Sequence, residues 1–250
     1  MNETKSSKTK FGELLQTNKF AILLEIGVVF VPLYLLLIVS DKLGGNDFVL
    51  LGGNVVLVGA PIVYLGMILA LVAVWVTSKM RGISWPYFGL ARPKSWLRTI
   101  LMGIGMTIAF MVTATLLVQL LKLVNLNTEA DLSRFAPLHG NLPNLVINVV
   151  ALWFTAGFVE EFLWRGYLMN RLVDLLGKKT RLAWVIALVG SSIIFGLGHT
   201  YQGLGGVIKI SAIGLLLGAG FLSVRRNLWP LIIVHVIIDT ISMVQHYFGG

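Results

Sequence analysis

The sequence predicts an all-α fold, a polytopic bundle of about seven transmembrane helices. Of its 250 residues, 56% are hydrophobic and only 12% are charged, which leaves too little polar surface for a water-soluble globule of this size. Several apolar runs have the roughly 20 residues that a helix needs to cross about 30 Å of hydrocarbon. These runs do not alternate in polarity, as the strands of a membrane barrel would.

Seven apolar runs are the predicted spans, with boundaries that are soft by a few residues. They are about Phe20 to Val39, Val49 to Val76, Leu97 to Leu121, Leu145 to Met169, Leu182 to Gly198, Val207 to Val224 and Leu228 to Tyr247. The fourth run keeps a helical pattern beyond the membrane as far as Gly177, so we expect one long, tilted or bent helix there.

Glycines mark two further features of the second half of the chain. Five of them lie between Gly196 and Gly206, a density that favours a loop or a short re-entrant stretch over a helix interior. Gly214 and Gly218 are four residues apart in the sixth span, where they would let a neighbouring helix approach closely.

Basic residues predict the topology. Of the 20 Lys and Arg residues, 15 fall on one side of the predicted membrane and four on the other when Arg98 and Lys209, at the ends of two spans, are counted with the adjoining loops. Only Arg165 lies deep inside a span. By the positive-inside rule, the N-terminus is cytoplasmic and the C-terminus faces outward, in a multi-pass protein of the cell membrane. The first apolar run lacks a cleavage pattern and is expected to remain as a span.

The composition also excludes some functions. The net charge of +9 comes from scattered basic residues without interleaved aromatic residues, so no nucleic-acid partner is expected. Because the chain has no cysteine, disulfides, thiolate metal sites and a cysteine nucleophile are excluded.

Ionisable side chains within the spans each cost several kcal/mol unless they are paired or hydrated. Glu25 lies near Lys19 and the predicted cytoplasmic face, so we interpret it as a snorkelling or locally paired carboxylate. Glu160 and Glu161 are different, because Arg165 follows Glu161 by four residues and can pair with it on one helix face.

Two histidines belong with these carboxylates. His235 and Asp239 are four residues apart, so Asp239 can hold the second nitrogen of the imidazole. His199 and Glu160 lie at similar distances along the chain from the turn at Lys179, which places them at the same depth. His235 reaches that depth only if the earlier helical hairpin projects into the cytoplasm.

This set of residues fits more than one role. A carboxylate can act as general base on water, with one histidine sharing the proton transfer and the other donating to the developing oxyanion. A glutamate and two histidines can instead ligate zinc and leave one position for water. An ion network that only holds the helices together is a third interpretation.

The motifs at these positions resemble those of the CPBP family, the CAAX-protease and bacteriocin-processing membrane proteases. That family has E-E-x-x-x-R, then F-x-x-x-H, then H-x-x-x-N or H-x-x-x-D. Here the three motifs occur in order as Glu160 to Arg165, Phe195 to His199 and His235 to Asp239. The resemblance covers roughly Leu145 to Met243 and divides the chain into a cytoplasmic tail (1–19), N-terminal transmembrane helices (20–144) and a catalytic transmembrane domain (145–247).

The resemblance implies roles for individual residues. Glu160 would activate water together with His199, and His235 with Asp239 would stabilise the oxyanion. Glu161 and Arg165 would support the site structurally. If a divalent metal such as zinc is used, its ligands would be Glu160, His199 and His235; a metal-free mechanism needs no cofactor. Asparagine replaces Asp239 in the eukaryotic prenyl-protein branch, so prenyl-protein processing does not follow from the motif.

The leading functional hypothesis is an intramembrane endopeptidase that hydrolyses a peptide bond in a membrane-associated protein or peptide. The alternative is a non-catalytic membrane protein that binds a bacteriocin in self-immunity or serves a regulatory role. A transporter or proton path is a third class, but the sequence has no visible inverted repeat. The expected partners are the substrate and the lipid bilayer.

Overall fold

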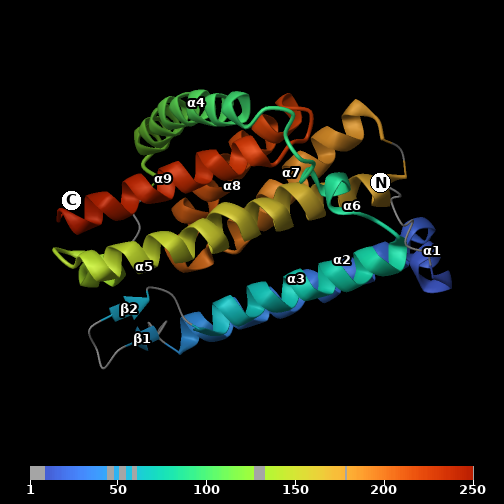
Figure 1. Cartoon of the computed structure of the whole chain (residues 1–250), viewed down its shortest axis with the longest axis horizontal. Helices are drawn as coiled ribbons and strands as arrows, with labels where there is room; N and C mark the ends of the chain where they lie inside the picture. Colours follow the sequence, from blue (N-terminus) through green and yellow to red (C-terminus); the bar gives the residue numbers. More distant parts are fainter. Residues whose placement is uncertain are drawn as a thin grey trace.

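The computed structural model describes residues 9–43, 48–50, 55–57, 61–126, 133–177 and 179–249. Helices dominate this part of the chain and form an elongated bundle (Figure 1). The elements are α1 (Lys10–Thr17), α2 (Lys19–Lys42), β1 (Phe48–Leu50), β2 (Val55–Leu57), α3 (Pro61–Arg81), η2 (Trp85–Phe88), α4 (Trp96–Leu123), η3 (Ser133–Leu138), α5 (Leu142–Leu152), η4 (Trp153–Leu168), α6 (Met169–Leu176), α7 (Arg181–Leu197), η5 (Thr200–Gln202), α8 (Gly203–Ser223) and α9 (Trp229–Tyr247).

Six helical runs in the described residues are long and apolar enough to cross a membrane. They contain α2, α3, α4, the continuous run from α5 to α6, α8 and α9. The predicted fifth span is α7, an apolar helix of 17 residues, which at 1.5 Å per residue is somewhat shorter than a hydrocarbon core of about 30 Å. The prediction of a helical membrane bundle is confirmed, and the chain is a multi-pass membrane protein.

The first and last helices lie at opposite ends of the bundle. In Figure 1, α1 is at the right-hand end and α9 runs toward the left-hand end. This arrangement agrees with an odd number of crossings. Which end faces the cytoplasm stays a prediction from the distribution of basic residues.

The predicted start of the second span is wrong. Instead of a helix from Val49, the chain forms the antiparallel pair β1 and β2, with Val49 opposite Val56, and α3 begins only at Pro61. Two asparagines of α5 hold the second strand. The side chain of Asn144 accepts from Val56 N at 2.9 Å, and Asn148 donates to Val56 O at 2.8 Å. These bonds satisfy the extended backbone, which a helix would have satisfied internally.

The long helix predicted around the fourth span is confirmed. The run of α5, η4 and α6 covers 35 residues from Leu142 to Leu176 and ends at Gly177, whose φ of 76° is typical of a glycine helix cap. Its middle part, η4, is wound as a π-helix over 16 residues. Because π turns are rare and often occur at functional sites, this winding favours a functional role for the residues of η4.

The glycine-rich segment from Gly196 to Gly206 contains a break between two α-helices at residues 198–202, so the predicted interruption is present but is shorter than the segment. Helix α7 continues to Leu197 and α8 starts at Gly203. A Cβ at Gly196 would lie 1.9 Å from Ser211 Oγ, which shows that this glycine is needed for contact between α7 and α8. The predicted close approach at Gly218 is confirmed, because a Cβ there would lie 2.3 Å from Leu188 Cδ1.

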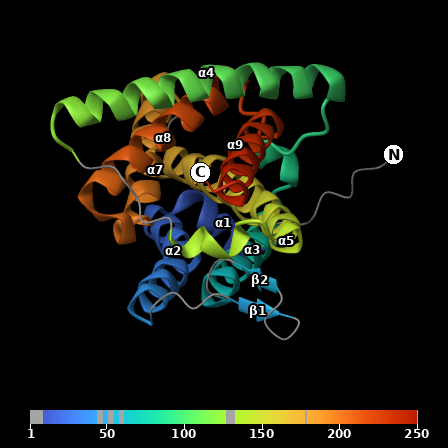
Figure 2. The same cartoon turned by 90° about the vertical axis from the view of Figure 1, so that its left-hand side faces the viewer.

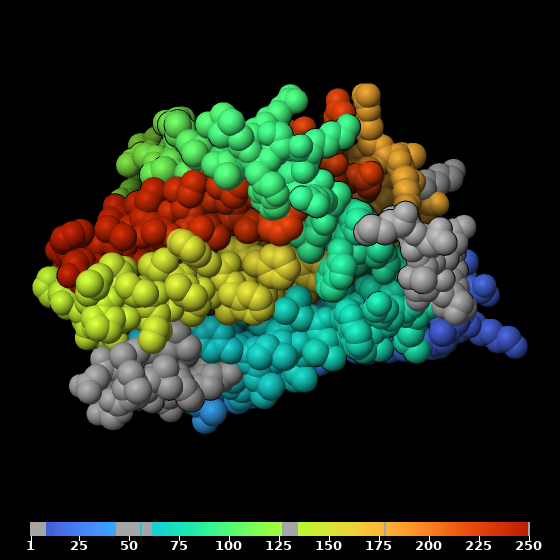
Figure 3. Space-filling model, in the orientation of Figure 1, coloured from blue at the N-terminus to red at the C-terminus, as the bar shows by residue number. Residues whose placement is uncertain are grey.

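Helix α4 differs in direction from the rest of the bundle. In Figure 2 it runs across the view above α8 and α9, whereas α2, α3 and α9 are seen nearly end on. The space-filling view shows α9, the run of α5 and η4, and α3 as successive bands below it (Figure 3). The helix that carries the first motif therefore lies in the middle of the molecule, between α9 and the N-terminal helices.

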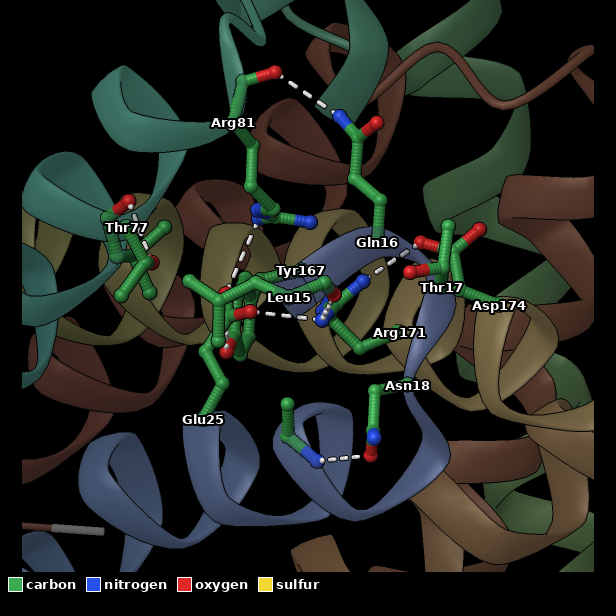
Figure 4. A network of polar contacts seen from close by, with 12 residues as sticks. Leu15, Gln16, Thr17, Asn18, Glu25, Thr77, Arg81, Tyr167, Arg171 and Asp174 are labelled. Carbon is green, nitrogen blue, oxygen red and sulfur yellow. Dashed lines mark hydrogen bonds and ion pairs between the residues drawn. The ribbon is translucent and has the colours of Figure 1, made fainter. Parts of the chain in front are cut away.

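A buried ion network joins the N-terminal helices to α6 and η4 (Figure 4). Glu25 of α2 lies 3.1 Å from Arg81 Nη2 and 2.7 Å from Arg171 Nη2, and all three side chains are 0% exposed. The hydroxyl of Tyr167 donates to Glu25 Oε1 at 3.1 Å. The interpretation of Glu25 as a snorkelling or locally paired residue is therefore wrong, because its partners come from α3 and α6.

Asp174 extends this network toward the bundle surface. Its Oδ2 lies 2.9 Å from Arg171 Nη1 and accepts from the hydroxyl of Tyr87 at 2.8 Å. Burial raises the pKa of Tyr87, and the neighbouring carboxylate raises it further. The Tyr87 hydroxyl therefore stays protonated and remains a donor.

Part of the predicted tail is the helix α1, which packs against α2 and α3. It caps the end of α3, since Thr9 N donates to Met80 O at 3.1 Å and Gln16 Nε2 donates to Arg81 O at 2.9 Å. Gly12 permits this contact, because a Cβ there would lie 1.8 Å from Met80 O. The orphan carbonyl groups at the end of α3 are thereby satisfied.

Candidate functional site

Three elements supply the predicted site residues. Helix η4 carries Glu160, Glu161 and Arg165, and α9 carries His235 and Asp239. His199 precedes η5, directly beyond the end of α7. The packing of η4 against both α7 and α9 brings the three motifs together.

Glu161 is the centre of the closest contacts. Its Oε1 accepts from Arg165 Nη1 at 3.0 Å and lies 2.9 Å from His235 Nδ1, and its side chain is 0% exposed. Arg165 also stacks over the Phe195 ring, 4.7 Å from its centroid. The expected i,i+4 pair of Glu161 with Arg165 is thus present, whereas its contact with His235 was missed by the sequence analysis.

His235 lies between two carboxylates. An ionised carboxylate only accepts hydrogen bonds, so the Nδ1 atom that faces Glu161 carries a hydrogen. On the other side, Nε2 is 3.8 Å from Asp239 Oδ2, which is an ion-pair distance but too long for a hydrogen bond. The two carboxylates favour a positively charged ring, and the side chains of His235 and Asp239 remain 14% and 22% exposed.

The orientation of His199 is set by its own helix end. Its Nδ1 lies 3.1 Å from the carbonyl oxygen of Phe195. Because a carbonyl can only accept, Nδ1 carries the hydrogen and Nε2 of the neutral ring is a proton acceptor. The ring also packs edge-on against Phe195, with centroids 5.1 Å apart. Phe195 therefore contacts both His199 and Arg165.

Glu160 has a different environment from its neighbour Glu161. Its side chain is partly exposed, whereas Glu161 is fully buried. Glu160 lies beside Glu161 on η4, which packs against α9. Of the two adjacent carboxylates, Glu160 is thus the one that a reacting molecule reaches more easily.

The arrangement does not match a preformed metal site. Within the described ranges of the chain, no three His, Asp or Glu side chains are grouped so that they could hold a metal ion. Glu160, His199 and His235 do lie in the same region, but His235 directs its Nδ1 to Glu161. We therefore derive no chemical step through a metal, and metal dependence stays a prediction for a chelation experiment.

Comparison with known proteins finds a family match for the part of the chain that carries these residues. Residues 142–241 match the family model described as Type II CAAX prenyl endopeptidase Rce1-like. The matched segment starts with α5 and includes all seven fixed residues of the three motifs, from Glu160 to Asp239. Neither a curated protein nor a solved structure matches the chain. The resemblance to CPBP membrane proteases is confirmed, because the segment 142–241 matches this family model.

Proposed function

We propose that this protein is an intramembrane endopeptidase that hydrolyses a peptide bond in a membrane-associated protein or peptide. The observation that carries the proposal is the cluster of the buried Glu161 and Arg165 with His235, which has Asp239 3.8 Å away, inside an apolar bundle. Glu160 lies on the same element, η4, and His199 lies just beyond the end of α7, which packs against η4. Such groups are costly at membrane depth and are usually retained for function.

In this mechanism Glu160 is the general base. It takes a proton from water while the water oxygen attacks the carbonyl carbon of the substrate, and His199 shares the proton through its free Nε2. The positively charged His235, held by Asp239 and Glu161, donates to the oxyanion of the tetrahedral intermediate. The proton held by Glu160 or His199 then passes to the leaving amine as the C–N bond breaks.

Glu161 and Arg165 are proposed to hold the site in place. Their ion pair is buried, and Glu161 orients His235 through Nδ1. Glu161 is fully buried and bound by Arg165 and His235, whereas Glu160 is partly exposed. This difference favours Glu160, and not Glu161, as the base.

The substrate is proposed to have an apolar part. A cavity of about 240 Å³ lies between α4, α8 and α9. Its lining is mostly apolar and includes Val234, which precedes His235 in α9. A lipid-anchored or membrane-spanning peptide would bury apolar surface there, which supports a membrane-associated substrate.

The test uses purified protein in liposomes with a library of membrane peptides. Glu160→Gln keeps the side-chain volume but removes the basic carboxylate, so kcat should fall by about 100- to 10,000-fold while thermal stability is unchanged. The matched control is Glu13→Gln, an exposed carboxylate of α1. Loss of cleavage on chelation would select a metal-dependent mechanism.

Two outcomes would contradict the assignment. If Glu161→Gln abolishes turnover in a folded protein while Glu160→Gln leaves it intact, the roles of the two glutamates are reversed. If neither variant changes the activity of the wild type, hydrolysis at this site fails. The non-catalytic immunity or regulatory binding role would then take its place.

A further inference from the structure

Hydrogen bonds at the end of α7 position His199. Helix α7 stops at Leu197, so its last carbonyl groups have no partner in a following turn. Local bonds satisfy two of them: Gly198 N donates to Phe195 O at 3.2 Å, and His199 N donates to Gly196 O at 2.9 Å. His199 Nδ1 adds a second bond to Phe195 O.

The preceding carbonyl group, that of Ile194, is bound from a different part of the chain. The hydroxyl of Tyr34 in α2 donates to it across a separation of 160 residues. Tyr34 lies outside the matched segment 142–241, so the family comparison assigns it no role. The helix end that carries His199 is thus attached to an N-terminal helix.

Tyr34 also lies beside the site itself. A Cβ at Gly198 would be 3.5 Å from the Tyr34 hydroxyl oxygen and 3.7 Å from its Cε1, so the phenol ring rests against the residue that precedes His199. The phenol therefore lies beside the backbone that positions His199, one of the two groups that the proposed mechanism uses to activate water.

We propose that Tyr34 is a positioning residue of this site, which holds the end of α7 so that His199 Nε2 meets the water activated by Glu160. This inference rests on the proposed function. The hydroxyl hydrogen of Tyr34 is donated to Ile194 O, so Tyr34 acts by positioning the end of α7 and not as an acid. Small displacements of catalytic groups are costly, since a shift of about 1 Å can reduce the rate about 100-fold.

The variant Tyr34→Phe removes the hydroxyl and keeps the ring. We expect kcat to fall about 10- to 100-fold, with KM within about twofold because the substrate is not contacted. The matched control is Tyr167→Phe, which removes another buried hydroxyl but one that is bonded to Glu25. An unchanged kcat in Tyr34→Phe, or an equal fall in Tyr167→Phe, would overturn the proposal.

A double-mutant cycle tests whether Tyr34 acts through His199. In a His199→Ala background, Tyr34→Phe should cause little further loss, because the group that it positions is already absent. If the two losses multiply, Tyr34 acts independently of His199 and the proposed role is wrong.

Hydrogen exchange gives a readout that does not need activity. Tyr34→Phe should speed amide exchange in the peptide around 194–202 but leave α9 unchanged, because only the end of α7 loses its anchor. If the wild type cleaves no peptide, the proposed function fails, and the exchange comparison still decides the structural claim. Unchanged exchange at 194–202 would overturn it.

Discussion

Two clusters of buried charge in this protein both pair a glutamate with arginine, but their central carboxylates differ in their partners and in the exposure of those partners. In the Glu25 network, the carboxylate has an arginine at each oxygen, and Glu25, Arg81 and Arg171 have side chains that are 0% exposed. Asp174, at the edge of this network, is 17% exposed, and it is bound by Arg171 and Tyr87. In the site cluster, Glu161 is equally buried, but His235 and Asp239 remain 14% and 22% exposed.

The difference indicates what each cluster does. A carboxylate that is fully buried and has a cation at each oxygen holds helices together but offers nothing to a substrate, because no new group can reach it. A charge that stays partly accessible at membrane depth is costly, and such a cost is typical of a functional site. The Glu25 network therefore supports the fold, whereas the partly exposed His235 and Asp239 of the site cluster can be reached by a substrate.

The largest expected effect is on the Glu25 network. Glu25→Ala leaves Arg81 and Arg171 as buried cations without their shared carboxylate. Breaking a buried pair in this way costs about 3–5 kcal/mol, so we expect a large loss of thermal stability and of accumulation in the membrane. Thermal unfolding of the purified protein in detergent measures the effect.

Two further variants sharpen this test. Glu13→Ala removes an exposed carboxylate from α1 and should change little. Adding Arg171→Met to Glu25→Ala removes one of the two stranded cations, and part of the lost stability should return. A Glu25→Ala protein as stable as Glu13→Ala would show that the network does not hold the fold.

A smaller effect is expected at Arg165, although its ion pair is also buried. Arg165→Ala removes the bond to Glu161 and the stacking on Phe195, but Glu161 keeps His235 as a partner. We therefore expect a loss of about 1.5–3 kcal/mol, below that of Glu25→Ala. Arg181→Ala, at an exposed arginine of α7, is the control. A stable Arg165→Ala protein without turnover would instead place Arg165 in the catalytic set.

The sequence predicts local contacts of the site well. The pair of Glu161 with Arg165 follows from a four-residue spacing on one helix, and the long helix that carries it follows from continuous hydrophobic periodicity and a terminal glycine. The contact of Glu161 with His235 joins residues 74 positions apart. No spacing rule selects which of two adjacent glutamates faces another helix.

In the N-terminal half, too, contacts between residues far apart in sequence could not be predicted from residue spacing. A local partner was predicted for Glu25 because Lys19 is near it in sequence. In the structure its partner Arg171 is 146 positions away. The segment from Val49 was predicted to be part of a span because its apolar residues suit a membrane helix and a β-strand equally. The bonds from the α5 asparagines to β2 depend on the tertiary fold, so they could not be predicted from the sequence.

The smallest effect is expected for a variant that changes the Glu25 network and leaves the site cluster intact. Tyr167→Phe removes one donor to Glu25 Oε1, while Arg81 still contacts the same oxygen. The ring contacts with Phe30 and Phe88 remain. We expect a loss of about 0.5–1.5 kcal/mol of stability, measured by thermal unfolding, and an unchanged kcat.

This last variant is informative because Tyr167 lies on the same helix as the site, two residues after Arg165. If the two clusters are independent, a change in the Glu25 network lowers stability without altering turnover, since effects at separate sites add. A fall in kcat with Tyr167→Phe would mean that the network transmits its geometry along η4 to Glu160 and Glu161. Measuring the same variant in the Glu25→Ala/Arg171→Met background, which has no acceptor at position 25, would then show whether that transmission passes through the hydrogen bond, because the fall should disappear once the acceptor is absent.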